Sequence, residues 1–129
     1  MTNSKDVASL EAKLDSLPGD DRARVPLLLE LLFLGGHDRH EDIVFDLGLF
    51  GDPVAIPAIA KVAEEPPSYI VEAGQWTLHP FQRKCAFALA RIGTLESRQV
   101  LEHLAGHANP ALREYGNEGL GNWPMPWTP

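Results

Sequence analysis

Histidine and carboxylate side chains cluster at residues 37–42, in the segment His-Asp-Arg-His-Glu-Asp. His37 and His40 are three residues apart, which places both rings on one side of a helix. Imidazole and carboxylate groups can bind zinc or iron, so His37, His40 and Glu41 are candidate metal ligands. The alternative is a charged helix start, in which Asp38 and Glu41 interact with the free amide groups of the first turn. We favour this alternative, which predicts no cofactor.

Two other groups of residues have the types needed for chemistry. His103 and His107 are four residues apart, but Gly106 lies between them where a helix is expected to end, and polar residues commonly occupy a last turn. The thiol of Cys85 follows Lys84, and a basic neighbour lowers a thiol pKa. Its position on an apolar stripe favours a core cysteine instead. Because no nucleophile, phosphate-binding or dinucleotide motif occurs, we expect no catalytic residue and no enzymatic activity.

Length and composition favour one globular domain. The chain has 129 residues, and its single cysteine excludes an internal disulfide. It has no apolar run of the roughly 20 residues that a membrane span needs, and no apolar secretory core follows the first methionine. We therefore expect a cytoplasmic protein that does not enter membranes.

Charge is distributed unevenly along the sequence. Residues 1–79 contain 14 acidic and 6 basic residues, whereas residues 80–129 contain 4 acidic and 5 basic ones. An acidic surface repels phosphate backbones, so a nucleic-acid partner is not expected. It favours a protein partner with a basic surface. The alternative is that acidity only maintains solubility.

Residues 4–34 are expected to form two N-terminal helices. Apolar residues recur every three to four positions over 4–16, and the Pro-Gly pair that follows ends this helix. A second helix is predicted over 21–34; it is apolar nearly all round, as in a helix that packs on both sides. Gly35 and Gly36 are expected to provide its left-handed end.

Residues 38–65 are expected to form a helix pair. Asp38 is the predicted cap of its first helix, with Glu41 three positions later in a capping-box arrangement. A Gly-Asp-Pro turn begins the second helix, which ends before Pro66.

Residues 66–79 are expected to form an inserted loop. A loop of this length is usually functional or disordered, and the aromatic residues Tyr69 and Trp76 argue against disorder. Tyrosine and tryptophan dominate binding hot spots, so the loop is a candidate contact surface. The alternative is that the loop folds back and its rings fill the groove between helix pairs.

A second helix pair is predicted at residues 80–107, with Gly93 in its turn. Aligning Gly93 with Gly51 superimposes the two pairs at an offset of 42 residues and matches their apolar positions: Leu47 with Leu89, Phe50 with Ile92, Ile59 with Leu101 and Val62 with Leu104. A two-helix unit that repeats along the chain is the signature of a stacked solenoid.

The C-terminal residues restart the unit only in part. Residues 109–121 repeat the start of the second pair, and the glycines within them are expected to end the helix early. The tail at 122–129 is rich in Trp and Pro and cannot be helical. We expect Trp123 or Trp127 to cap an exposed end of the core.

Three segments resemble HEAT-like repeats of the short, phycobilisome-lyase type: DLGLFGDPVAIPAIAKV (46–62), HPFQRKCAFALARIG (79–93) and NPALREYGNEGLG (109–121). The resemblance covers about residues 38–121. It implies an all-α fold, a short right-handed solenoid of about three helical hairpins, with the chain 1–129 forming one domain. It also implies a binding scaffold more than any particular chemistry.

Two enzymatic members of the wider repeat class do not match this sequence. A HEAT-repeat hydroxylase family holds two irons with His-Glu pairs at helix starts, and this chain has only one such pair, His40-Glu41. HEAT-like DNA glycosylases grip DNA with a basic concave face, and here the basic residues of the second half make no long stripe: Arg83, Lys84, Arg91 and Arg98.

The expected function is therefore protein binding without catalysis. The setting that we favour is a small, monomeric bacterial protein that neutralises or regulates one partner, such as a toxin immunity protein. The alternatives are an adaptor, chaperone or lyase-type subunit, and, with less support, a metal-dependent enzyme. The predicted contacts are aromatic anchors with neighbouring charged and polar residues on the loop and the preceding helix: Tyr69, Glu72, Gln75, Trp76, Lys61, Glu64 and Glu65.

Overall fold

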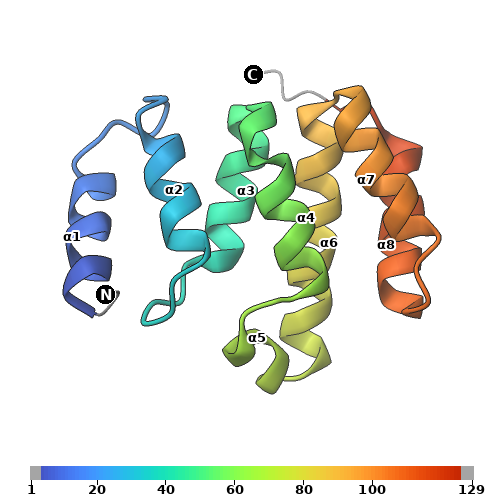
Figure 1. The fold of residues 1–129 in the computed structure, drawn as a ribbon, viewed down its shortest axis with the longest axis horizontal. Helices are drawn as coiled ribbons and strands as arrows, with labels where there is room; N and C mark the ends of the chain where they lie inside the picture. Colours follow the sequence, from blue (N-terminus) through green and yellow to red (C-terminus); the bar gives the residue numbers. More distant parts are fainter. Residues whose placement is uncertain (1–3, 126–129) are drawn as a thin grey trace.

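The computed structural model describes residues 4–125, and all of its regular structure is helical (Figure 1). In chain order the elements are α1 (Ser4–Asp15), α2 (Arg24–Leu32), α3 (His40–Phe50), the 3-10 helix η1 (Pro53–Ala55), α4 (Ile56–Glu64), α5 (Ser68–Glu72), α6 (Gln75–Ile92), α7 (Leu95–Ala105) and α8 (Pro110–Asn122). Residues 4–125 contain no strand, which confirms the predicted all-α class. No helix in this part of the chain is long and apolar enough to cross a membrane.

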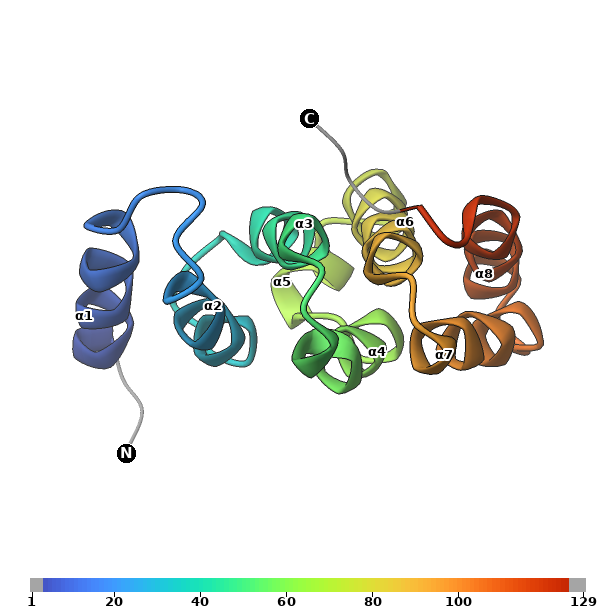
Figure 2. The same cartoon turned by 90° about the horizontal axis from the view of Figure 1, so that it is seen from above.

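The helices lie in two rows. Viewed from above, α3, α6 and α8 form one row, and α2, α4 and α7 form the other (Figure 2). Within the first row α6 packs against both α3 and α8, and between the rows α2 packs on α3, α4 on α6 and α7 on α8. The helix α1 packs on α2 at the N-terminal end. The helices inside the rows therefore bury their apolar stripes against more than one neighbour, whereas α1 packs mainly on α2.

One apolar core runs through the described chain. Its largest side chains are nearly inaccessible to solvent, and each contributes about 1.5–3 kcal/mol of burial free energy; they are Phe81, Leu14, Leu28, Leu31, Leu32, Ile43, Leu47, Ile56, Ile59, Ile70, Leu89 and Leu101. They come from α1 through α7, so these seven helices share one core.

Two glycines fix the turns of the helix pairs α3–α4 and α6–α7. Gly51 has φ 67° and ψ 18°, and Gly93 has φ 70° and ψ 20°, a left-handed conformation that other residues adopt only with strain. Their N–H groups donate to the carbonyl oxygens of Leu47 and Leu89, which are themselves 42 residues apart. The two helix ends predicted to be equivalent from the sequence thus share one conformation and one hydrogen bond.

Side-chain caps explain where three later elements begin. The Asp52 carboxylate accepts a hydrogen bond from the N–H of Val54 at 3.0 Å, and Asn109 caps α8 in the same way. Thr94 and Ser97 form a reciprocal capping box at the start of α7. Each such cap stabilises its helix by about 1 kcal/mol.

The predicted inserted loop at 66–79 is wrong, because most of this segment is helical. Residues 68–72 form α5, which Ile70 anchors in the core, and residues 75–79 form the first turns of α6. The second helix pair therefore begins at Gln75 instead of residue 80, and Pro80 lies inside its first helix. Five residues are too few for apolar periodicity to reveal a helix.

The glycines of α8 do not end the helix as predicted. The helix continues to Asn122, because Gly116 and Gly119 are the points at which it crosses its neighbours. A Cβ atom on Gly116 would lie 2.4 Å from the backbone nitrogen of Ala105, and one on Gly119 would lie 2.6 Å from a methyl carbon of Leu101. The absence of a side chain lets the helices approach closely.

The ends of the molecule differ from the prediction in smaller ways. The helix α2 spans fewer residues than the predicted 21–34, and α3 begins at His40 after Arg39, without a side-chain cap from Asp38. The indole N–H of Trp123 donates to the carbonyl oxygen of Thr94 at 3.1 Å, so this residue covers the α6–α7 turn as expected of the tail. The other predicted capping residue, Trp127, lies outside the described residues.

Candidate functional site

The short helix α5 and the first turns of α6 form a spur that extends beyond the ends of the neighbouring helices (Figure 1). Gly74 joins the two helices with φ 92°, a value that favours glycine at this position. Ile70 faces the core and holds the spur against the rest of the fold, while Val71 and Trp76 face solvent. The predicted contact residues Glu72 and Gln75 are also exposed here.

Trp76 is the most exposed large apolar residue of residues 4–125, at 86% of its full accessible area. A tryptophan side chain buries on the order of 150–250 Å² when it is covered, so this exposure leaves a large apolar area in water. The residue lies in a regular helix, which holds its ring in a limited set of orientations. An ordered, exposed tryptophan is the residue type that most often anchors a protein interface.

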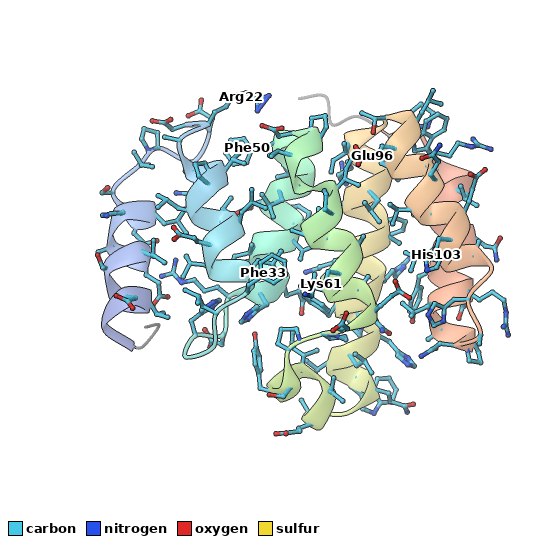
Figure 3. All side chains as sticks on the ribbon, in the orientation of Figure 1. Arg22, Phe33, Phe50, Lys61, Glu96 and His103 are labelled. Carbon is cyan, nitrogen blue, oxygen red and sulfur yellow. The ribbon has the colours of Figure 1, made fainter. Side chains whose placement is uncertain are left out.

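A groove of about 300 Å³ lies beside the spur, between the end of α2, the end of α4 and α5. It combines apolar lining residues with two charged ones, Lys61 of α4 and Glu65, which directly follows this helix. The Lys61 ammonium lies 6.0 Å from the centre of the half-exposed Phe33 ring, and Figure 3 shows these two residues next to each other. Tyr69 of the spur forms another part of the wall.

The wall of this groove is held by a buried histidine. His40 donates from Nε2 to the carbonyl oxygen of Leu34 at 3.0 Å, because a carbonyl can only accept. Its Nδ1 is then unprotonated and accepts the hydroxyl hydrogen of Tyr69, at 2.9 Å. Burial, together with the nearby ring of His37, lowers the pKa of His40 to about 4. Burial likewise raises the pKa of Tyr69, so both groups are neutral at pH 7.

The candidate metal ligands are occupied by the protein itself. His37 stacks on His40 with ring centres 4.2 Å apart, accepts the Arg39 N–H at Nδ1 and donates from Nε2 to the carbonyl oxygen of Leu31. Neither histidine has a free ring nitrogen. The carboxylate of Glu41 pairs with the ammonium of Lys84 at 2.7 Å. Within residues 4–125 no group of three or more His, Cys, Asp or Glu residues is placed to hold a metal ion.

The second histidine pair converges on one predicted contact residue. Glu64 accepts from Nε2 of His107 at 2.8 Å and from Nε2 of His103 at 3.4 Å, so its carboxylate faces α7 and not the groove. Because Nδ1 of His107 accepts the N–H of Asn109, its Nε2 carries a hydrogen, which suits a carboxylate but not a metal. Glu64 and the histidines therefore link α4 to α7.

The structure thus divides the predicted contact residues into three groups. Tyr69, Lys61 and Glu65 line the groove, while Trp76, with Glu72 and Gln75, lies on the adjoining spur; Glu64 lies apart. The sequence interpretation missed Phe33, which it placed in a helix packed on both sides but which is half exposed. It also missed His40 as a structural partner of Tyr69, since the two residues are 29 positions apart and only the fold brings them together.

Cys85 has no reactive role in this arrangement. The residue is completely buried, and burial raises the pKa of its thiol far above the ordinary value. The prediction of a core cysteine is confirmed.

Comparison of the chain with protein-family models, curated proteins and solved structures finds no significant match in any of the three.

Proposed function

We propose that the chain is a short right-handed α-solenoid of about three HEAT-like helical hairpins. The 42-residue offset supports this, because Gly51 and Gly93 share one turn conformation and the matched positions Leu47 and Leu89 are both inaccessible. The two rows of helices in Figure 2 support it as well. In a fold of this type, consecutive units present a continuous surface on which partners bind.

Its function in this proposal is non-enzymatic binding of one protein partner. The observation that carries the proposal is the 86% exposure of Trp76 on the ordered α5–α6 spur. Trp76 enters a pocket on the partner, and Val71 on the preceding helix widens the apolar contact. Lys61 and Tyr69 line the adjacent groove, which receives a side chain of the same partner.

The partner in this proposal has a basic surface around an apolar pocket. Residues 1–79 carry a net charge of −8, and the exposed Glu65 and Glu72 flank the spur and the groove. Opposite charges accelerate association and fix the orientation of the two proteins. An acidic surface around an exposed apolar anchor suits a bacterial immunity protein that covers a basic toxin in the cytoplasm. A general adaptor without a dedicated partner does not need such a surface.

The test is quantitative capture from lysate of cells that carry the gene, followed by titration calorimetry with the purified partner. Trp76→Ala should weaken binding by roughly 2 kcal/mol, about 30-fold in Kd, because a buried tryptophan anchor is lost. The folded state should keep its stability, since the ring contacts solvent.

Leu95→Ala is the matched control. Leu95 is also a large exposed apolar residue, 74% accessible, but it lies at the start of α7, away from the spur. Binding should be unchanged in this variant. A partner that binds wild type, Trp76→Ala and Leu95→Ala equally well would exclude the spur as the contact site. An increase in kcat of the partner, instead of its inhibition, would exclude neutralisation.

A further inference from the structure

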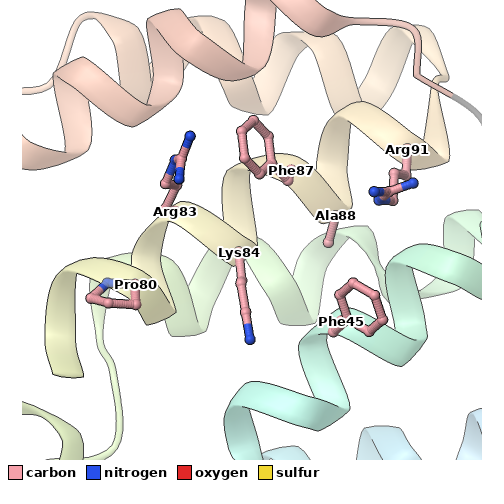
Figure 4. Close-up of a pocket in the computed structure, with 7 residues that line it drawn as sticks. All are labelled: Phe45, Pro80, Arg83, Lys84, Phe87, Ala88 and Arg91. Carbon is pink, nitrogen blue, oxygen red and sulfur yellow. The ribbon is translucent and has the colours of Figure 1, made fainter.

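A second groove, of about 210 Å³, lies between α3 and α6, in the other row of helices (Figure 4). Its lining comes from Phe45 of α3 and from positions 80, 83, 84, 87, 88 and 91 of α6, which recur every three to four residues and so share one face of the helix. We call it the α6 groove. Three of the four basic residues named in the sequence analysis form a short stripe here: Arg83, Lys84 and Arg91.

Two of the three cations of the α6 groove are held in place. Arg83 pairs with Glu118 at 2.7 Å, and its guanidinium lies 4.9 Å from the centre of the Phe87 ring. Lys84 pairs with Glu41, and its ammonium lies 5.9 Å from the Phe45 ring. Each cation therefore lies over an aromatic face, and both remain partly accessible to a further anion.

Arg91 is the third cation, and no residue in the described part of the chain neutralises its charge. Its stem passes close to α3, where a Cβ atom on Gly48 would lie 3.6 Å from the Arg91 Cδ. Its guanidinium forms no hydrogen bond or ion pair with any residue between 4 and 125. Figure 4 places it at one end of the α6 groove, beyond Ala88 and Phe45. A guanidinium presents paired donors that match the two oxygens of a carboxylate.

The size of the α6 groove indicates what can occupy it. Pockets for free small molecules usually measure about 300–1,000 Å³, and this one is smaller. The space between Phe45 and Phe87, above the small Ala88, fits one large side chain of a macromolecule. An aromatic ring there would stack on the phenylalanines, and an acidic group next to it would reach Arg91.

We propose that the α6 groove binds an acidic peptide segment of a second partner, with one aromatic side chain between Phe45 and Phe87 and a carboxylate on Arg91. This surface is separate from the spur and has the opposite charge preference. A nucleic acid is disfavoured because Glu41 and Glu118 border the groove and the protein carries a net charge of −7. Three cations over about two helical turns also provide few phosphate contacts.

The test is fluorescence anisotropy with a short fluorescein-labelled peptide, a single phenylalanine flanked by glutamates, added to the full chain at low salt. We expect weak binding, with a Kd on the order of 10–100 μM, as suits one anchor and a few charge-assisted contacts. Arg91→Glu should weaken it at least roughly tenfold. Phe45→Ala should weaken it several-fold, because half of the aromatic clamp is lost.

Lys13→Glu is the matched control, since it makes the same change in net charge on an exposed residue of α1. It should leave the Kd within about twofold of wild type. An equal loss of peptide affinity in Lys13→Glu and Arg91→Glu would mean that only the net charge of the protein matters, and it would overturn the proposal. Tighter binding of a fluorescein-labelled single-stranded oligonucleotide, weakened by the same Arg91→Glu change, would assign the groove to nucleic acid instead.

Amide chemical shifts of wild-type protein provide a readout that does not depend on the folding of any variant. The acidic peptide should shift the resonances of residues 83–91 and of Phe45. Shifts confined to the spur or spread over the whole chain would also overturn the proposal. The matching peptide with lysines in place of glutamates should shift none of these signals.

Discussion

Two buried polar side chains, His40 in α3 and Gln82 in α6, are 42 residues apart and therefore occupy equivalent positions of the two helix pairs. Each donates to a carbonyl oxygen at the end of the preceding unit: His40 to that of Leu34, and Gln82 to that of Ala63 at 3.1 Å. The carbonyl oxygen of Ala63 cannot accept a hydrogen bond within its own helix, because the residue four positions later is Pro67, which has no N–H.

The two positions differ in their second polar atom. Nδ1 of His40 accepts from the hydroxyl of Tyr69, whereas Oε1 of Gln82 is buried and has no partner within the described residues. An unpaired buried oxygen costs about 1–3 kcal/mol. The difference is due to α5, which supplies Tyr69 to the first unit and has no counterpart at the second.

This comparison shows how the spur is attached to the scaffold. The Tyr69 hydroxyl secures α5 to α3, and the same ring lines the proposed binding groove. A change in the protonation of His40 would therefore act on the groove through one hydrogen bond. At the equivalent position Gln82 cannot titrate, so this coupling is confined to the first unit.

The largest expected effect is acid destabilisation through His40. Its pKa is about 4 in the folded chain against an ordinary 6.5, so the unfolded chain binds more protons between these values. The free energy of unfolding is highest above pH 6.5, where the ring is neutral in both states. It falls as the pH drops from 6.5 towards 4, by on the order of 3 kcal/mol in all. Urea unfolding at pH 7, 6 and 5 measures the slope.

His40→Gln is the comparison variant for this pH dependence. It gives the first helix pair a glutamine, the residue that occupies the equivalent position, 82, of the second helix pair. The variant should lose most of the pH dependence between 6.5 and 4.5. The carboxylates of Asp15 and Glu118, whose pKa values are lowered by hydrogen bonds from Arg39 and Arg83, should affect both proteins alike and only at lower pH. An unchanged slope in His40→Gln would mean that His40 titrates normally and is not sequestered.

The repeated scaffold could be predicted from the sequence because its signals are local. Gly51 and Gly93 mark left-handed turns, and the apolar spacing around Leu47 and Leu89 is dictated by the helical period. The errors at Gly116 arose where a tertiary contact overrides a local preference: glycine lowers helix propensity, but here it allows the backbone of α7 to approach.

The candidate site could be predicted only in part. The aromatic residues Tyr69 and Trp76 were recognised by type, although their segment is helical and not a loop. The partner of Tyr69 is 29 residues away, and the α6 groove exists only because Phe45 of α3 lies opposite α6. Contacts between helices that are distant in sequence leave no local sequence signal, so local patterns do not predict these two contacts.

A smaller effect is expected from Tyr69→Phe, which removes one hydroxyl and keeps the ring. Nδ1 of His40 loses its donor, so the variant should be less stable by about 1–2 kcal/mol at pH 7. The pKa of His40 should rise, because the free lone pair accepts a proton more readily, and this should move the acid transition to higher pH. Nuclear magnetic resonance titration of the imidazole signals checks the direction; a lowered pKa would contradict the assigned donor.

The smallest effect is expected from Gln82→Met, which replaces the amide with an apolar side chain of similar length. The carbonyl of Ala63 loses its donor, but the unpaired Oε1 disappears as well, so the two changes largely offset each other. The net change in the free energy of unfolding should stay within about 1 kcal/mol by urea denaturation. His40→Met, the same change at the equivalent position, should cost at least about 2 kcal/mol, because it removes two satisfied hydrogen bonds and relieves none. Equal losses in the free energy of unfolding at both positions would mean that Oε1 of Gln82 has a water partner. The two helix pairs would then differ only in the source of the second hydrogen bond, which is Tyr69 at His40 and water at Gln82.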